Sequence, residues 1–154
     1  MDFEKSAMNA YATVFAGVNV QGCLYNLSQN IYRHVQSLDL QERYQSDAEC
    51  ALQVRIVAAL AFVPVADVVN SFEELQDKVQ SHSTPVLDYF EDNYIGIKLR
   101  RARANPPFAH AVWNVHERAE QELPRTNNNI EGWHRRLQAV VSAYDPSIWK
   151  CIKF

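Results

Sequence analysis

Apolar residues recur at helical spacing in four consecutive segments between residues 27 and 96, and this periodicity limits the possible folds more than any other feature. A stripe of apolar side chains along one side of a helix must pack against another element. Only 4 glycines and 6 prolines are present to interrupt regular structure among the 154 residues. The pattern therefore predicts a mainly helical chain.

Start and stop signals define the expected helices. Ser46 and Glu49 have the spacing of a capping box, Pro64 is a stop, and Thr84 followed by Pro85 is a typical start. We expect helices over about 28–38, 46–64, 65–80 and 84–96. The side chains predicted to face the core are Leu27, Ile31, Val35, Leu38, Ala48, Leu52, Ile56, Ala59, Leu60, Val63, Val68, Val69, Phe72, Leu75, Val79, Val86, Leu87, Phe90 and Tyr94.

The remaining segments have weaker patterns. The apolar spacing over residues 3–15 predicts a helix that ends at Gly17. Its apolar face would comprise Phe3, Ala7, Ala10, Tyr11 and Val14. Residues 18–27 alternate as in a short strand, where Gly22 indicates a close backbone approach, and 108–115 could be a second extended segment. Residues 97–107 predict an exposed loop, and helices are expected after the asparagines at 127–129.

Composition and charge exclude several classes of protein. With 47% hydrophobic and 21% charged residues, the chain is typical of a single globular domain. A net charge of −3 excludes a uniformly basic nucleic-acid-binding protein, but residues 96–154 carry a net +5 and residues 65–95 a net −6. Such polarity either steers an anionic partner to one end or reflects solvated helix faces.

The number of cysteines and the distribution of apolar residues indicate the cellular compartment in which the chain is expected. Three cysteines, Cys23, Cys50 and Cys151, leave one thiol unpaired in any pairing, which favours a reducing, intracellular environment. The first residues lack the basic and apolar regions of a signal peptide. No uninterrupted apolar run of 18 residues exists, so no membrane partner is expected.

Three short segments contain residue types that can serve in catalysis or bind a metal ion. Asp2 and Glu4 lie where acids favour a helix N-terminus, which is a structural alternative to a catalytic role. Cys23 and Asn26 have a ligand-like spacing, although asparagine is a poor metal ligand. Glu131 is three residues before His134, and it serves either as a capping partner or as a ligand of a hard cation such as Mg²⁺.

The ordered strings DFEKSAMNAYATVF, GVNVQGCLYN, LAFVPVADVVNSFEEL, LDYFEDNYIG and WNVHERAEQELPRTNNNIEGWHRRL resemble the MULE (Mutator-like element) transposase domain. These are ribonuclease H-like transposases of the DDE type. The resemblance covers nearly the whole chain, and its most specific piece is RTNN-x-x-E-x-x-H, which includes Asn127, Asn128, Glu131 and His134. The resemblance implies an α/β core that is interrupted by a helical insertion. It also implies that the protein is nuclear and that it carries out DNA transposition with Mg²⁺ or Mn²⁺.

The resemblance also implies roles for individual residues. Asp2 matches the second catalytic acid and Glu131 the final one, and these two carboxylates would be the metal ligands. Cys23 matches the cysteine of the family's C-x-x-H motif, whose histidine is replaced here by Asn26. The family's first catalytic aspartate is expected upstream of anything in this sequence.

We therefore expect a mainly α-helical chain that forms one structural unit. It would be the remnant of an α/β fold and would keep one or two short strands. Its expected parts are a partial ribonuclease H-like core at 1–45, a helical insertion at 46–95, and a basic loop with catalytic-type helices at 96–154. The expected function is that of a partial or degenerate transposase domain without DNA cleavage, and metal is not expected to bind tightly. Weak electrostatic DNA binding would use Lys98, Arg100, Arg101, Arg103, Arg125, Arg135 and Arg136.

Two alternatives remain open. One is an active metal-dependent transposase that is completed by another chain. The other is a domesticated helical module that binds DNA or protein without catalysing a reaction. The sequence does not define an oligomeric state.

Overall fold

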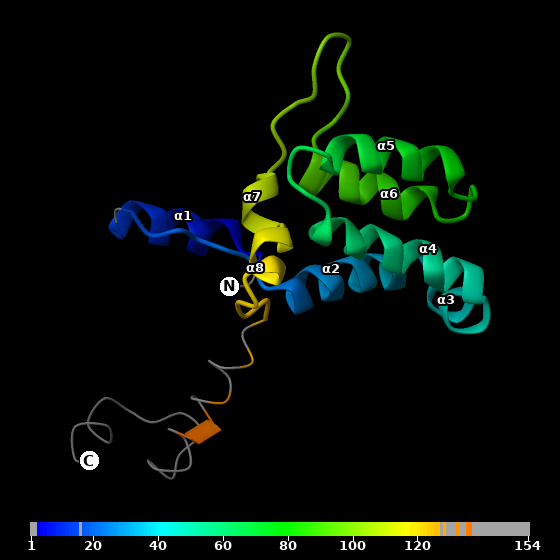
Figure 1. Ribbon diagram of the computed structural model, residues 1–154. Coiled ribbons are helices and arrows are strands. Elements are labelled where there is room, and N and C mark those ends of the chain that lie inside the picture. Colours follow the sequence, from blue (N-terminus) through cyan, green and yellow to red (C-terminus); the bar gives the residue numbers. More distant parts are fainter. Residues whose placement is uncertain (1–2, 16, 127, 129–131, 133–134, 137–154) are drawn as a thin grey trace.

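The computed structural model describes residues 3–15, 17–126, 128, 132, 135 and 136 (Figure 1). The chain is mainly helical, as predicted. The elements are α1 (Lys5–Val14), α2 (Leu24–Ser37), α3 (Gln41–Ser46), α4 (Ala48–Ala59), the 3₁₀ turn η1 (Leu60–Phe62), α5 (Val68–Lys78), α6 (Thr84–Phe90), the π-helical turn η2 (Glu91–Ile95), α7 (His110–Trp113) and α8 (His116–Glu120).

One apolar core joins most of these elements. Helix α2 lies alongside α4, α6 packs against both of them, and α5 contacts the turns η1 and η2 (Figure 1). The helices of 46–95 therefore share their core with α2 and with the segment around α7, and no strand is found among residues 48–79. The buried residues of the core are Leu27, Ile31, Val35, Val54, Val57, Leu60, Ala61, Val68, Phe72, Val86, Leu87, Phe90, Tyr94, Ile95, Trp113 and Val115.

Helix α4 begins one residue later than the capping box predicted. The Asp47 carboxylate accepts hydrogen bonds from the backbone N–H groups of Glu49 at 3.0 Å and Cys50 at 3.3 Å. The bond from Cys50 contributes most to holding the pKa of Asp47 below its ordinary value. The Ser46 hydroxyl instead donates to the Glu42 carbonyl at 2.9 Å within α3, a short helix that the sequence pattern did not predict.

The buried face of α4 also differs from the prediction. Leu52 and Ile56, predicted to be core residues, are 55% and 39% exposed, whereas Val54 and Val57 are buried. Apolar residues occupy nearly every side of this helix, so the periodicity contains no unique face. Contacts with α2 and α6 select the buried side.

The strand predicted at 18–27 is wrong. Residues 18–23 form an irregular segment, and α2 begins at Leu24. Hydrogen bonds to distant residues hold this segment: Gly22 N–H donates to the Val112 carbonyl at 2.7 Å, and Leu24 N–H to the Arg125 carbonyl at 3.0 Å. The extended segment predicted at 108–115 contains α7, and the described residues have β pairing only as one isolated bridge between Lys98 and Arg103.

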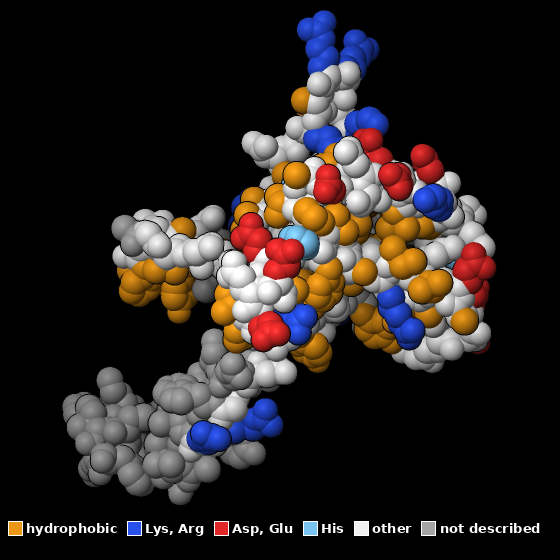
Figure 2. All heavy atoms as spheres, in the orientation of Figure 1, with side chains coloured by type: hydrophobic (Ala, Val, Ile, Leu, Met, Phe, Trp, Pro, Cys, Tyr) orange, Lys and Arg blue, Asp and Glu red, His pale blue; other side chains and the backbone are white. Residues whose placement is uncertain are grey.

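Helix α1 is confirmed, but its predicted apolar face is not buried. Met8 is its one buried residue, while Tyr11 is 47% and Val14 71% exposed. The helix projects from the rest of the molecule (Figure 1), and an apolar surface runs along one side of it (Figure 2).

The residues preceding α1 are anchored by an aromatic contact. The Phe3 ring packs edge-on against Tyr94 at 5.6 Å and against Phe108 at 5.3 Å between ring centroids. A Cβ atom at Gly22 would lie 2.5 Å from Phe3 Cζ. The close approach predicted at Gly22 is therefore real, and it is made by a side chain.

Candidate functional site

A polar pocket of about 230 Å³ lies between the residues preceding α1 and the first turns of α2. Glu4, which follows the anchored Phe3, lines this pocket together with amide and guanidinium side chains of α2. The Asn30 amide also donates to the Tyr94 hydroxyl at 3.4 Å, which ties the pocket to the core. Its lining residues are Phe3, Glu4, Asn26, Gln29, Asn30 and Arg33.

The segment containing Cys23 and Asn26 lies beside the segment that precedes the asparagine run. The Leu24 N–H to Arg125 carbonyl hydrogen bond joins them, and the Arg118 guanidinium donates to the Gly22 carbonyl at 3.1 Å. Cys23 itself is 2% exposed. Burial lowers the pKa of Arg118, and the nearby Cys23 partly offsets this shift.

Several predicted site residues lie outside the described part of the chain. These are Asp2, Asn127, Glu131 and His134. The approach of Asp2 to Glu131 therefore stays a prediction. Asn128 is described and is exposed to solvent.

The lining of the polar pocket does not by itself fit a divalent cation. Mg²⁺ prefers several oxygen ligands that include carboxylates. The polar pocket offers one carboxylate, Glu4, together with the cationic Arg33. Elsewhere among the described residues, no group of three or more His, Cys, Asp or Glu side chains could hold a metal ion.

Residues 97–104, which we call the basic arm, fold back on themselves and project from the helical body beyond α5 and α6 (Figure 1). Ala104 N–H donates to the Ile97 carbonyl at 2.9 Å, and Leu99 N–H donates to the Ala102 carbonyl at 2.8 Å. These bonds place Arg100 and Arg101 at the tip of the arm, where both are exposed. Figure 2 shows cationic side chains at this tip.

Arg103 lies at the base of the arm, and its side chain is only 13% exposed. Its guanidinium donates to Glu91 at 2.5 Å, to Glu73 at 2.9 Å and to the Gly96 carbonyl at 2.6 Å. Lys98 also contacts Glu73, at 3.0 Å. We call Arg103, Glu73 and Glu91 the latch. Among the predicted DNA-contacting cations, Arg103 is thus engaged within the protein.

The contacts of the latch shift the pKa values of its members. Hydrogen bonds from Lys98, and then from Arg103, hold the pKa of Glu73 below its ordinary value. Burial opposes the charged form of Arg103, but hydrogen bonds to Glu91 and Glu73 outweigh it, and the pKa of Arg103 is raised. The remaining predicted cations, Arg125, Arg135 and Arg136, are exposed.

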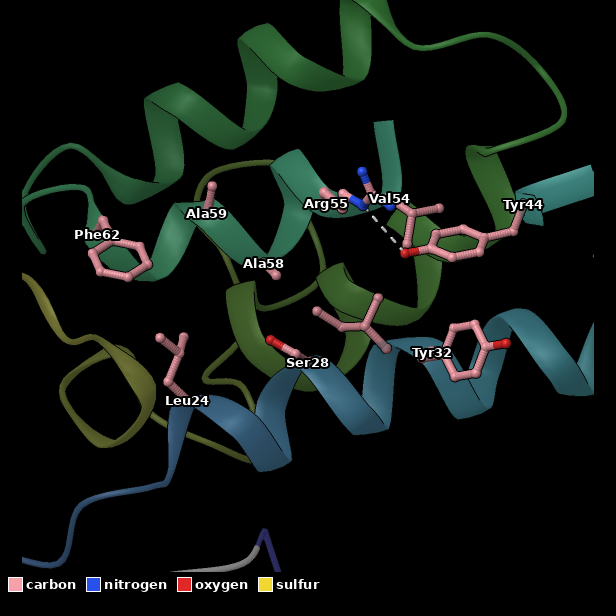
Figure 3. A pocket seen from close by; sticks show the side chains of 10 residues that line it. Leu24, Ser28, Tyr32, Tyr44, Val54, Arg55, Ala58, Ala59 and Phe62 are labelled. Carbon is pink, nitrogen blue, oxygen red and sulfur yellow. Dashed lines mark hydrogen bonds between the residues drawn. The ribbon is translucent and has the colours of Figure 1, made fainter. Parts of the chain in front are cut away.

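A second pocket, of about 290 Å³, lies between α2 and α4 (Figure 3). Arg55 Nε donates to the Tyr44 hydroxyl at 3.4 Å at one side, and the floor is mostly apolar. The lining contains no carboxylate and no imidazole, so it could accommodate an apolar group but offers no acid–base pair. Sequence periodicity gave no signal for it, because Tyr44 belongs to none of the apolar stripes. The lining residues are Leu24, Ser28, Ile31, Tyr32, Tyr44, Val54, Arg55, Ala58, Ala59 and Phe62.

Across the described part of the chain, no helix combines the length and apolar character needed to cross a bilayer. No protein-family model, curated protein or solved structure matches this chain.

Proposed function

We propose that this chain is part of a MULE-type transposase catalytic domain that binds DNA and that, as the 154-residue polypeptide, does not cleave it. The observation that carries the proposal is the hydrogen bond from Leu24 N–H to the Arg125 carbonyl. It joins the segment of the C-x-x-N motif to the start of the R-T-N-N motif, although about a hundred residues separate them in sequence.

The anchoring of Phe3 adds a third motif segment to the same region. Glu4 follows Phe3 directly and shares the polar pocket with Asn26. Segments that carry the resemblance in three distant parts of the sequence therefore meet around one end of α2. A catalytic domain requires such convergence, because carboxylates that share metal ions must approach closely.

The proposed lack of cleavage follows from the number of carboxylates. The resemblance implies three catalytic acids, and these 154 residues supply counterparts for two, Asp2 and Glu131. Asn26 also replaces a histidine with a poor metal ligand.

The purified 154-residue chain should neither nick nor join duplex DNA when Mg²⁺ or Mn²⁺ is added, yet it should bind duplex DNA at low salt. The absent third carboxylate is the reason for the first result, and exposed cations are the reason for the second. Supercoiled-plasmid nicking and fluorescence anisotropy measure the two activities. Metal-dependent nicking that Glu131→Gln abolishes would disprove the inactive assignment, and absence of DNA binding would disprove the binding assignment.

A cysteine pair tests the family assignment independently of activity. We expect the carboxylates of Asp2 and Glu131 to lie within about 4–6 Å, the range over which such charges interact strongly. Asp2→Cys combined with Glu131→Cys should then form an intramolecular crosslink with a short bifunctional thiol reagent, which mass spectrometry detects. The background should contain Cys151→Ser, whereas Cys23 and Cys50 are buried and can stay.

The matched control pairs Asp2→Cys with Glu122→Cys. Glu122 is exposed, and the resemblance assigns no catalytic or metal-binding role to it. Equal crosslinking of the two pairs, or no crosslinking of the Asp2–Glu131 pair, would end the assignment of these two residues to one site.

A further inference from the structure

We propose that the basic arm enters the major groove of duplex DNA, with Arg100 and Arg101 as its contact residues and the latch as the device that holds it in place. The inference rests on the proposed DNA-binding function and specifies which surface makes the contact. It also separates Arg103, a positioning residue, from the cations that touch DNA.

The shape of the arm suits a groove. Two chain segments, joined by hydrogen bonds between Ile97 and Ala104 and between Leu99 and Ala102, run side by side to a tight turn. The major groove of B-DNA is about 12 Å wide and admits a two-stranded ribbon. The arm projects from the helical body (Figure 1), so its tip can enter a groove while the body stays outside.

The chemistry of the tip suits phosphates and base edges. Within the described ranges, neither Arg100 nor Arg101 makes an ion pair or a side-chain hydrogen bond, so their donors are available to a ligand. Arginine is the commonest side chain for bidentate contact with guanine. Leu99 beside them is 57% exposed and could contact a thymine methyl group.

The latch makes the arm rigid before DNA arrives. Arg103 is held by two carboxylates and the Gly96 carbonyl, and its guanidinium lies 5.9 Å from the centre of the Phe72 ring in the core. A preformed arm loses less conformational entropy on binding than a mobile one would. The latch should therefore strengthen DNA binding even though it contributes two negative charges.

The first experiment measures Kd for a duplex of about 20 base pairs as salt rises from about 50 to 200 mM. Arg100→Gln with Arg101→Gln should flatten the slope of log K against log salt by about 2, because each lost phosphate contact removes about 0.9. The matched control, Arg43→Gln with Lys78→Gln, removes the same charge from exposed sites elsewhere and should leave the slope nearly unchanged.

The second experiment uses a variant for which electrostatics and loss of the latch predict opposite changes in Kd. Glu91→Gln removes one negative charge, so electrostatics alone predicts tighter DNA binding. Loss of the latch predicts the opposite, a Kd about threefold to tenfold higher, because the arm must then be ordered on binding. Glu74→Gln, an equal charge change on an exposed side chain outside the latch, should bind as tightly as the parent or more tightly.

Circular dichroism checks that the Glu91→Gln chain is folded, and Glu73→Gln serves as a second latch variant if it is not.

A duplex whose major groove is filled by glucosylated 5-hydroxymethylcytosine should bind more weakly than the plain duplex. Equal binding to both duplexes, equal slopes for the arm and control variants, or tighter binding by both latch variants would each overturn the inference. In each case the parent chain would still bind DNA, so the proposed function would stand. No binding by the parent chain would overturn both.

Discussion

Phe90→Ala should lower the free energy of unfolding by about 3–5 kcal/mol, the usual cost of deleting a buried aromatic ring. Phe90 has no exposed surface, and its ring centroid lies 5.0 Å from that of Tyr94 and 5.4 Å from that of Trp113. Because domains of this size are stable by about 5–15 kcal/mol, the loss should be evident in urea unfolding followed by circular dichroism.

The control for this prediction is Leu52→Ala. Leu52 belongs to the apolar stripe that the sequence predicted to be buried, but it is 55% exposed. We expect its replacement to change the free energy of unfolding by no more than about 0.5–1 kcal/mol. A loss for Leu52→Ala as large as that for Phe90→Ala would show that α4 presents the opposite face to the core.

Gly96→Ala should be nearly as damaging, with an expected loss of about 3 kcal/mol. Gly96 has φ of +97°, a conformation that costs other residues about 1–3 kcal/mol. The added Cβ would also collide with the Ala104 carbonyl oxygen at the base of the basic arm, and it would lie 3.3 Å from Pro106 Cδ. The backbone there must shift, because neither neighbour is the end of a flexible side chain.

Gly17→Ala separates the two causes. Gly17 also has a positive φ, of +84°, but no heavy atom lies within 4 Å of the position of its Cβ. It should lose only the conformational part, about 1–2 kcal/mol. Urea unfolding of both variants gives the difference, which measures the steric restraint. Equal losses would mean that the base of the arm is not tightly packed.

The boundaries of the helices were largely predictable, because they depend on local chemistry. Helix α6 begins at Thr84, one residue before the predicted first position at Pro85. Gly96 ends the η2 turn, and the stripe of Leu27, Ile31 and Val35 is the buried face of α2. Each signal acts within a few residues, through a fixed φ, a missing Cβ or a repeat of about 3.6 residues. The capping error at Ser46 was one residue, because Asp47 is an equally suitable cap.

The candidate sites were only partly predictable. The exposure of Arg100 and Arg101 followed from a proline-rich, cationic segment. The latch could not be predicted from the sequence, because Glu73 and Glu91 lie on α5 and η2, and only packing brings them to Arg103. No local signal distinguishes this largely buried arginine from the exposed ones two and three residues before it.

The sequence alone determined that the chain is helical and where most of its helices begin and end. The tertiary structure alone decided which side of α4 is buried and which cation is held in the latch. It also decided that the backbone N–H groups of Gly22 and Leu24 donate to Val112 and Arg125 in place of a strand partner. The physical reason is the range of the interactions. Turn chemistry and periodicity act between near neighbours, whereas burial and ion pairing depend on residues that meet only after the chain has folded.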